Sequence, residues 1–343
     1  MANMNAVVVR HGRQFRYEQV ERPQAGPGEM VIQVEAAGIC AADRKIYSGT
    51  HPWQLPDPYI PGHEYVGTIV EMGEHVAESI GLGLGDRVTA EIIVPCRTCW
   101  FCHRGLYHLC DRPGVCVGAW AEYMKIPNGA IVHRVPTELP AEEAVLIEPL
   151  SCSIHGIELA RIGLDDTVVI AGLGAIGMGM LQVAHLKTPR LLIGLDIDDG
   201  LTRVAQELGA DYVFNPARED VVANIQALTE GRGCDIYVEA SGSPKSINLG
   251  LEALRKAGRL VIFGVYGHEA TVDFNLVSEF KELEIIGGHL SPNTYPLAVH
   301  CLVERRVDAR VMVTHVFPLA EFEEAIAIKG QPGVTSIKTV LIP

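Results

Sequence analysis

The chain has 343 residues, which is more than one ordinary hydrophobic core needs and predicts roughly two domains. Apolar residues make up 48% and charged residues 20%, so we expect a folded globular protein rather than a disordered one. The 28 basic and 42 acidic residues give a net charge of −14, which disfavours nucleic acid and anionic membranes as partners. The apolar run Val7–Val9 is too short for a signal peptide, so we expect a cytoplasmic protein.

The first part of the chain, to about residue 134, contains short alternating strands broken by Gly and Pro. The clearest of these strands are residues 31–35, 66–70 and 87–90. This pattern predicts a β-rich, barrel-like domain, followed by a connecting helix at residues 150–162.

Beyond about residue 164, buried strands alternate with amphipathic helices. The predicted strands are residues 168–171, 191–196, 212–214, 236–239, 260–264 and 284–287. Six strands with helical crossovers predict an α/β fold with a doubly wound parallel sheet. Residues 167–186 carry no Asp, Glu, Lys or Arg, but their four glycines and a β-branched run indicate a strand, a loop and a helix rather than a membrane span.

A glycine-rich loop opens the first of these helices. Gly172, Gly174 and Gly177 fit G-x-G-x-x-G directly after a predicted strand, where glycines let the backbone approach a pyrophosphate. Asp196 lies nineteen residues after Gly177, where a carboxylate accepts hydrogen bonds from the adenosine ribose. The alternative is that Asp196 only caps the following helix. We therefore predict a dinucleotide site.

The loop after the second strand also bears on the choice of dinucleotide. Asp198 and Asp199 add negative charge beside Asp196, which favours NAD over NADP. Arg203 is the residue that would hold a 2′-phosphate in the alternative.

Four of the nine cysteines fall within fifteen residues, at Cys96, Cys99, Cys102 and Cys110. Closely spaced thiolates on a turn-rich loop converge on one tetrahedral zinc ion, and four sulfur ligands leave no open position. We predict a structural zinc site here. Free buried thiols and an iron–sulfur cluster are the alternatives.

A second set of candidate ligands is spread along the sequence. Cys40 lies in Gly-Ile-Cys-Ala-Ala-Asp, His63 and Glu64 lie in Pro-Gly-His-Glu-Tyr-Val-Gly, and Glu148 lies in Ile-Glu-Pro-Leu. With these motifs, the cysteine lobe and the glycine loop in this order, the whole chain resembles the zinc-containing medium-chain dehydrogenases, in the branch of polyol and threonine dehydrogenases.

The resemblance implies a GroES-like catalytic domain, formed by residues 1–155 and 291–343, and a Rossmann NAD-binding domain at residues 156–290. It makes Cys40 and His63 ligands of a catalytic zinc, with Glu148 as a direct or water-bridged third ligand and Glu64 as an exchangeable fourth. Asp43 matches the carboxylate that binds the far nitrogen of the histidine. The residues that fall where the family touches the cofactor are Ile176, Val265, His289 and Leu290.

The proton's exit departs from the family pattern, which commonly has Ser or Thr two residues after the ligand cysteine and His five residues after it. Here these positions hold Ala42 and Lys45. We hypothesise that the proton leaves through metal-bound water with Glu64 or Glu148, or through Lys45. Lys45 as a solvated cation or a contact of the cofactor ribose is the alternative.

The resemblance implies oxidation of a secondary alcohol in a small polyol to a ketose with NAD, with erythritol or threitol as candidates and sorbitol-like polyols as further ones. The alternatives are an L-threonine 3-dehydrogenase and a non-catalytic nucleotide-binding protein that retains the fold. Cys152 is a rival zinc ligand or a buried thiol, and Tyr47, Trp53 and Trp120 are candidate pocket walls or core residues. The resemblance also implies a tetramer, or a dimer through the edges of the nucleotide-domain sheets.

Overall fold

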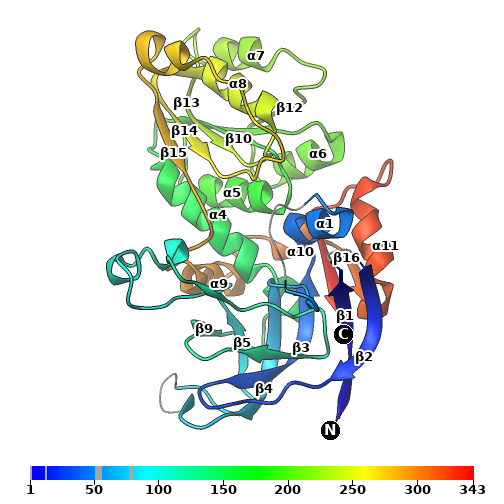
Figure 1. Ribbon diagram of the computed structural model, residues 1–343. Coiled ribbons are helices and arrows are strands. Elements are labelled where there is room, and N and C mark those ends of the chain that lie inside the picture. Colours follow the sequence, from blue (N-terminus) through cyan, green and yellow to red (C-terminus); the bar gives the residue numbers. More distant parts are fainter. Residues whose placement is uncertain (1, 12–13, 51–55, 77–80) are drawn as a thin grey trace.

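The computed structural model describes residues 2–11, 14–50, 56–76 and 81–343. Two large sheets dominate it, with a six-stranded sheet in the upper half of Figure 1 and a seven-stranded sheet in the lower half. Helix α4 (Ile147–Ala160) lies between the two halves. The expected helix at 150–162 begins earlier, because the first turn of a helix tolerates a proline such as Pro149.

The six-stranded sheet is parallel throughout. Its spatial order is β12-β11-β10-β13-β14-β15, the Rossmann order, which confirms the predicted fold class. The order reverses between β10 and β13, and ligands bind at the carboxyl ends of strands beside such a reversal. The strands are β10 (Thr167–Ala171), β11 (Leu191–Leu195), β12 (Tyr212–Phe214), β13 (Cys234–Glu239), β14 (Leu254–Ile262) and β15 (Glu284–Gly287).

Four helices alternate with strands of this sheet along the chain and connect the parallel strands. They are α5 (Ala175–Leu186), α6 (Asp199–Glu207), α7 (Val221–Leu228) and α8 (Pro244–Ala253). The uncharged segment 167–186 is divided between strand β10 and helix α5. Among the described residues, no helix has the length and apolar character needed to cross a membrane.

The seven-stranded sheet combines strands from both ends of the chain. Strands β17, β3 and β4 are neighbours in it, and both pairs are antiparallel. The end of β3 therefore lies beside the starts of β4 and β17. The strands are β3 (Met30–Gly38), β4 (Tyr65–Met72), β5 (Arg87–Ala90), β8 (Tyr123–Ile126), β9 (Val132–Arg134), β16 (Val313–Pro318) and β17 (Lys338–Ile342).

Smaller elements complete the β-rich half. Strands β1 (Asn3–Arg10) and β2 (Gln14–Glu21) form a hairpin sheet, and β6 (Ile93–Val94) pairs with β7 (Gly114–Val115). The helices of this half are α1 (Ala41–Ser48), α3 (Ala141–Ala144), α9 (Tyr295–Val303), α10 (Ala309–Met312) and α11 (Phe322–Ala327).

One hydrophobic core extends through both halves. It joins Val66 and Val340 of the seven-stranded sheet to Val168 of the six-stranded sheet through Ile154 of α4 and Tyr295 of α9. Burial of this continuous apolar surface holds the two sheets together and fixes the position of the residues between them.

Candidate active site

Three predicted ligands from two separate segments meet at one edge of the seven-stranded sheet. Cys40 is the N-cap residue of α1, just after β3, and His63 and Glu64 immediately precede β4. One ligand atom from each of the three lies within 4.8 Å of the others. The pairing of Ala37 with Tyr65 in neighbouring strands brings the two segments together. Sulfur, imidazole and carboxylate donors at this spacing suit zinc.

Lys338, which the sequence analysis missed, forms a buried ion pair with Glu64. Its Nζ lies 2.7 Å from Oε1 and 2.5 Å from Oε2 of Glu64, and both side chains are only 2% exposed. Burial opposes the charge of Lys338, but the negative charge of Glu64 and neighbouring acids raises the lysine pKa overall. A lysine at the start of an apolar C-terminal strand is the only sequence signal for this pair.

Several acidic groups gather around this point. The Cys40 side chain and the carboxyl groups of Asp43, Glu64 and Glu148 lie close enough to affect one another or their common neighbours electrostatically. Burial raises the pKa of both Asp43 and Glu148. Lys338 pairs with one of these carboxyl groups, Glu64, and the sulfur, imidazole and carboxylate donors of the cluster suit a divalent cation.

Glu148 lies on the first turn of α4 and is buried, but it is not part of the three-residue set within 4.8 Å. The Glu148 carboxyl group interacts electrostatically with His63 and Glu64. Cys152, one turn further along α4, is buried and donates its thiol hydrogen to Glu148 Oε1 across 3.5 Å. Cys152 is therefore a buried neighbour of Glu148 and lies outside the candidate ligand set.

Asp43 closes the first turn of α1. Its Oδ2 accepts the backbone N–H of Cys40 at 2.8 Å, which fixes the backbone that carries the candidate ligand. Its Oδ1 is buried and has no hydrogen-bond partner in the part of the chain that the structure describes. Asp43 and His63, both described by the structure, interact electrostatically, but no hydrogen bond joins their side chains.

Lys45 contacts the six-stranded half of the molecule. Its Nζ donates to the backbone carbonyl of Val265 at 3.1 Å, and its side chain is partly exposed. Val265 follows β14 in the six-stranded half and was predicted to touch the cofactor. The contact therefore joins α1 to the nucleotide side of the site.

The glycine loop between β10 and α5 has the backbone geometry that the motif requires. Gly172 has a φ of +89°, which only glycine adopts readily. A Cβ on Gly177 would lie 1.7 Å from the Gly172 carbonyl oxygen, so the helix and the loop could not approach as they do. Gly174 is the N-cap of α5 and supplies no side-chain cap. The first N–H groups of α5 are thus available to an anion.

Asp196 follows β11 and faces this loop. Its Oδ2 accepts the N–H of Leu173 at 2.7 Å, and its Oδ1 accepts the N–H of Asp198 at 3.0 Å. The cap of α6 is Asp198, whose Oδ1 accepts the N–H of Gly200 at 2.7 Å. The alternative that Asp196 is the helix cap is therefore wrong, because Asp196 braces the glycine loop instead.

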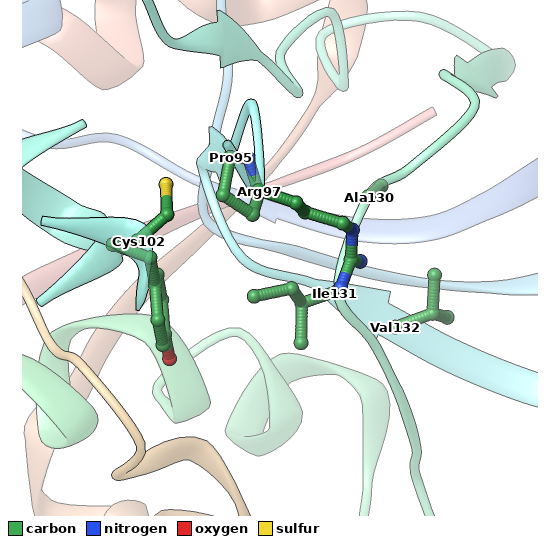
Figure 2. Close-up of a pocket in the computed structure, with 7 residues that line it drawn as sticks. Pro95, Arg97, Cys102, Ala130, Ile131 and Val132 are labelled. Carbon is green, nitrogen blue, oxygen red and sulfur yellow. The ribbon is translucent and has the colours of Figure 1, made fainter. Parts of the chain in front are cut away.

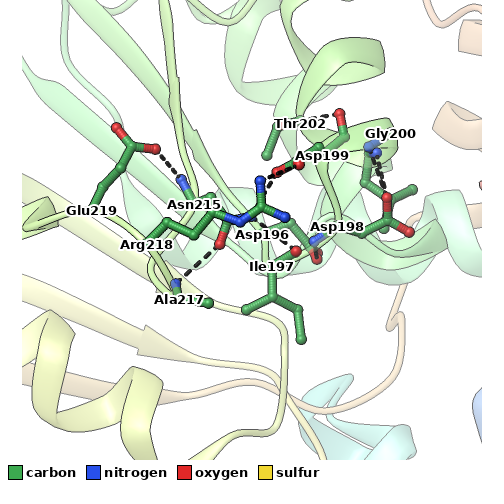
Figure 3. A network of polar contacts seen from close by, with 11 residues as sticks. Asp196, Ile197, Asp198, Asp199, Gly200, Thr202, Asn215, Ala217, Arg218 and Glu219 are labelled. Carbon is green, nitrogen blue, oxygen red and sulfur yellow. Dashed lines mark hydrogen bonds and ion pairs between the residues drawn. The ribbon is translucent and has the colours of Figure 1, made fainter. Parts of the chain in front are cut away.

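Figure 3 shows the polar network around the loop that connects β11 to α6. Asp199 accepts hydrogen bonds from Asn215 and Arg218, each at 2.6 Å. The hydrogen bond from Asn215 and the interaction with Arg218 lower the pKa of Asp199, so this carboxylate is charged at neutral pH. Arg218 is already paired with Asp199. The rim of the predicted ribose site, formed by Asp198 and Asp199, therefore stays acidic.

The remaining predicted cofactor residues lie at the carboxyl side of the same sheet. Ile176 is in the first turn of α5, and its carbonyl oxygen accepts from Ser153 at 2.9 Å. Val265 is 70% exposed. His289 and Leu290 follow β15, with Leu290 at a φ of +51°. Their cofactor contacts stay predictions.

The four clustered cysteines form a compact lobe. One sulfur from each lies within 4.8 Å of the others, and the Cys96–Cys102 and Cys99–Cys110 sulfur pairs are each separated by 4.0 Å. Sulfurs around a tetrahedral zinc with bonds of about 2.3 Å lie about 3.8 Å apart, so the lobe fits this ion. A hydrogen bond from Thr98 is the largest of the effects that lower the pKa of the Cys96 thiol.

A cavity of about 490 Å³ lies beside the cysteine lobe, which contributes Cys102 to its lining (Figure 2). It shares no residue with the Cys40 cluster or the glycine loop, so it is separate from both candidate binding sites. Its lining consists of Pro95, Arg97, Cys102, Tyr107, Ala130, Ile131 and Val132.

The aromatic residues near the ligands have different roles. Trp120 is fully buried, and its indole N–H donates to the Gly38 carbonyl at 3.2 Å, which makes it a core residue. Tyr47 is 37% exposed and packs edge-on against Phe15. Trp53 lies outside the described residues.

We predict that Cys99→Ser removes one zinc ion per chain and lowers the Tm by more than about 5 °C, because the lobe loses one of four ligands that hold its turns together. Metal analysis and a thermal melt measure both effects. Cys301→Ser, which changes a thiol on α9 outside either candidate metal site, is the matched control. Unchanged metal content in Cys99→Ser would contradict a structural zinc site.

Comparison with known proteins agrees with this geometry. Residues 26–137 match the alcohol dehydrogenase GroES-like domain, and residues 175–304 match the zinc-binding dehydrogenase domain. The chain is 41% identical to an erythritol/L-threitol dehydrogenase of Mycolicibacterium smegmatis, covering 99% of this chain and 98% of that protein. It is 34% identical to an L-threonine 3-dehydrogenase of Pyrococcus horikoshii, covering 90% of each.

A solved structure shows the same architecture over the full length. A zinc-binding dehydrogenase of Sinorhizobium meliloti bound to NADP superposes with a TM-score of 0.91 at 27% identity, covering 100% of both chains. The domain matches and the full-length relatives agree with the α/β architecture described above. This chain belongs to the zinc-containing medium-chain alcohol dehydrogenase family, in its polyol and threonine dehydrogenase branch, and is an oxidoreductase of alcohols that uses zinc and a nicotinamide dinucleotide.

Proposed function

We propose that the protein oxidises a secondary alcohol of a small polyol to a ketose and passes the hydride to NAD. Erythritol or threitol is the proposed substrate class, and sorbitol-like polyols are further candidates. The observation that carries the proposal is the meeting of Cys40, His63 and Glu64 within 4.8 Å, in a chain with a full-length relative named for erythritol and L-threitol.

We propose Cys40 and His63 as ligands of the catalytic zinc. Glu148 is the proposed third ligand, direct or through water, because it is buried beside the set without belonging to it. Glu64 is the proposed exchangeable ligand, and both of its oxygens accept from Lys338 in the present geometry. Zinc supplies a Lewis acid that stabilises the alkoxide form of the alcohol.

The other residues of the site orient and shield the reactants. Asp43 fixes the backbone of Cys40 through its hydrogen bond at 2.8 Å. The glycine loop offers backbone N–H groups to the pyrophosphate, and Asp196 is proposed to bind the adenosine ribose. Asp198 and Asp199 keep the rim acidic, which supports NAD rather than NADP as cofactor.

The proton leaves by a route other than the usual relay. Ala42 offers only a methyl group, which cannot carry a proton, and Lys45 donates to Val265 on the nucleotide side. We therefore propose Glu64 or Glu148 as the carboxylate that takes the proton from the metal side. Lys45 is proposed to contact the ribose of the cofactor.

Substrate screening tests the proposed activity. With NAD, we predict that kcat/KM for erythritol or a threitol exceeds that for sorbitol and L-threonine by at least about ten-fold, corresponding to about 1.4 kcal/mol of transition-state binding. NADP with the same substrates is the cofactor control.

The outcomes of this screen separate the candidates. A preference for L-threonine would favour the alternative supported by the Pyrococcus horikoshii relative. Full zinc content without alcohol-dependent NADH formation with any substrate would overturn the enzymatic proposal and favour a nucleotide-binding protein.

We predict that Lys45→Met raises the KM for NAD by about three- to ten-fold and leaves the pH dependence of kcat unchanged, because the lysine donates to Val265, a predicted cofactor residue. Steady-state kinetics between pH 6 and 10 measure both quantities, with Lys45→Arg as the conservative control. A shifted pH profile with an unchanged KM for NAD would instead place Lys45 in the proton route.

We also propose the domain boundaries, the compartment and the assembly. Strands β10–β15 form one sheet and the flanking segments another, which supports a Rossmann domain at 156–290 and a catalytic domain at 1–155 and 291–343.

All nine cysteines are free thiols, which suits the cytoplasm. The sheet edge at β15, with exposed Phe274 and Phe280 nearby, supports a dimer or tetramer through this edge.

We predict that Ile285→Glu weakens self-association at least about ten-fold, because it places like charges on two facing β15 edges. Sedimentation velocity at micromolar concentrations measures the assembly. Leu164→Glu adds the same charge at a 77% exposed site outside the sheet and is the control. An assembly of Ile285→Glu as tight as that of the control would contradict this interface.

A further inference from the structure

A short segment near the C-terminus reaches the nucleotide side of the molecule. It runs from the turn Ile328–Gly330, after α11, toward β17. Thr335 Oγ1 lies 1.9 Å from the position a Cβ would take on Gly200, so this segment packs directly on the first turn of α6. Figure 1 shows the red segment above α11 beside α6.

Lys329 of this segment faces the glycine loop. Its Nζ lies 3.8 Å from the position a Cβ would take on Gly174, and no other atom of the described residues outside the local chain lies within 4 Å of that position. Among the described residues, one ammonium group is thus the only neighbour of the space over Gly174. Gly174 itself begins α5 and contributes no side-chain cap.

Three cations approach this region, and two of them already have partners. Lys338 binds both oxygens of Glu64, and Arg44 donates to the carbonyl of Ile326 and to Thr339. In contrast, the side chain of Lys329 has no hydrogen bond or ion pair with any residue that the structure describes. It is the cation of the three that is free to take an anion.

The positive charge of Lys329 is only partly compensated by nearby negative charge. Its side chain reaches solvent, but nearby protein limits hydration of the ammonium group. This desolvation, together with repulsion from Arg44 and Lys338, lowers the pKa of Lys329, and Asp196 offsets only part of the effect. An added anion would relieve the repulsion and stabilise the charged lysine.

The other side of this space is formed by backbone N–H groups at the start of α5. The backbone N–H groups of Gly174, Ala175 and Ile176 have no acceptor among the described residues, and the positive end of the α5 dipole lies at the same place. An ammonium group and a helix N-terminus thus face one open space from two sides. A phosphate group accepts hydrogen bonds from both at once.

We propose that Lys329 binds the pyrophosphate of the dinucleotide from the side opposite the glycine loop. The C-terminal segment thereby becomes part of the cofactor site, and the bound cofactor links the two sheets through α5 and the 328–335 segment. The inference rests on dinucleotide binding, and it does not depend on which alcohol is oxidised.

The test measures equilibrium binding to the full-length, zinc-loaded protein by calorimetry, so it needs no turnover. The probes are NAD, ADP-ribose and adenosine, of which only the first two contain the pyrophosphate. For Lys329→Met we expect the Kd of NAD and of ADP-ribose to rise about ten-fold and the Kd of adenosine to change by less than about two-fold. Lys329→Arg keeps the charge and should restore most of the affinity.

Lys256→Met is the matched control, because Lys256 is exposed at the start of β14, the opposite end of the strands from the glycine loop. An NAD affinity of Lys329→Met equal to that of this control would overturn the proposal. A parallel loss of adenosine affinity would also overturn it, because it would show that Lys329 supports the shape of the site rather than the phosphates. Failure of the polyol screen would leave these binding results unaffected, so the two proposals fail separately.

Discussion

The order of three neighbouring strands is the constraint on which the catalytic centre depends. Because β17, β3 and β4 are antiparallel neighbours, the end of β3 lies beside the starts of the other two. Cys40, Glu64 and Lys338 are therefore drawn to one edge of the sheet although they are far apart in sequence. Gly38 permits the close approach, since a Cβ there would lie 2.2 Å from a carboxylate oxygen of Glu64.

The buried ion pair at this edge has a double effect. Removing one partner of a buried pair typically costs about 3–5 kcal/mol, because the other charge is left without compensation. Lys338 therefore stabilises Glu64 as an anion and also holds it by both oxygens. If Glu64 acts as an exchangeable ligand, the lysine contacts the same two oxygens that would face the metal, so we expect the ion pair to influence the exchange.

The sequence predicts the features that are local in the chain. The six predicted strands, the glycine loop and the cysteine lobe correspond to β10–β15, the start of α5 and the four-sulfur cluster, because periodicity and close spacing encode them directly. Helix α4 begins at Ile147, before the predicted start at residue 150, because Pro149 lies in its first turn, where a helix tolerates proline.

The features that sequence analysis missed depend on contacts between distant segments. Lys338 and Glu64 are 274 positions apart, and no spacing rule links them. Lys329 becomes relevant only because the C-terminal segment packs on α6, and Trp120 could be assigned to the core only once its contact with Gly38 was known. Such contacts follow from topology, which local patterns do not specify.

Zinc X-ray absorption spectroscopy combined with metal analysis of the parent and of His63→Ala tests the central claim most directly. The account predicts two zinc ions per chain in the parent, one with four sulfur ligands and one with mixed sulfur, nitrogen and oxygen ligands. In His63→Ala, the all-sulfur ion should remain, whereas the mixed ion and alcohol-dependent NADH formation should be lost. Retention of the second ion with an unchanged coordination spectrum would contradict a catalytic zinc at this strand edge.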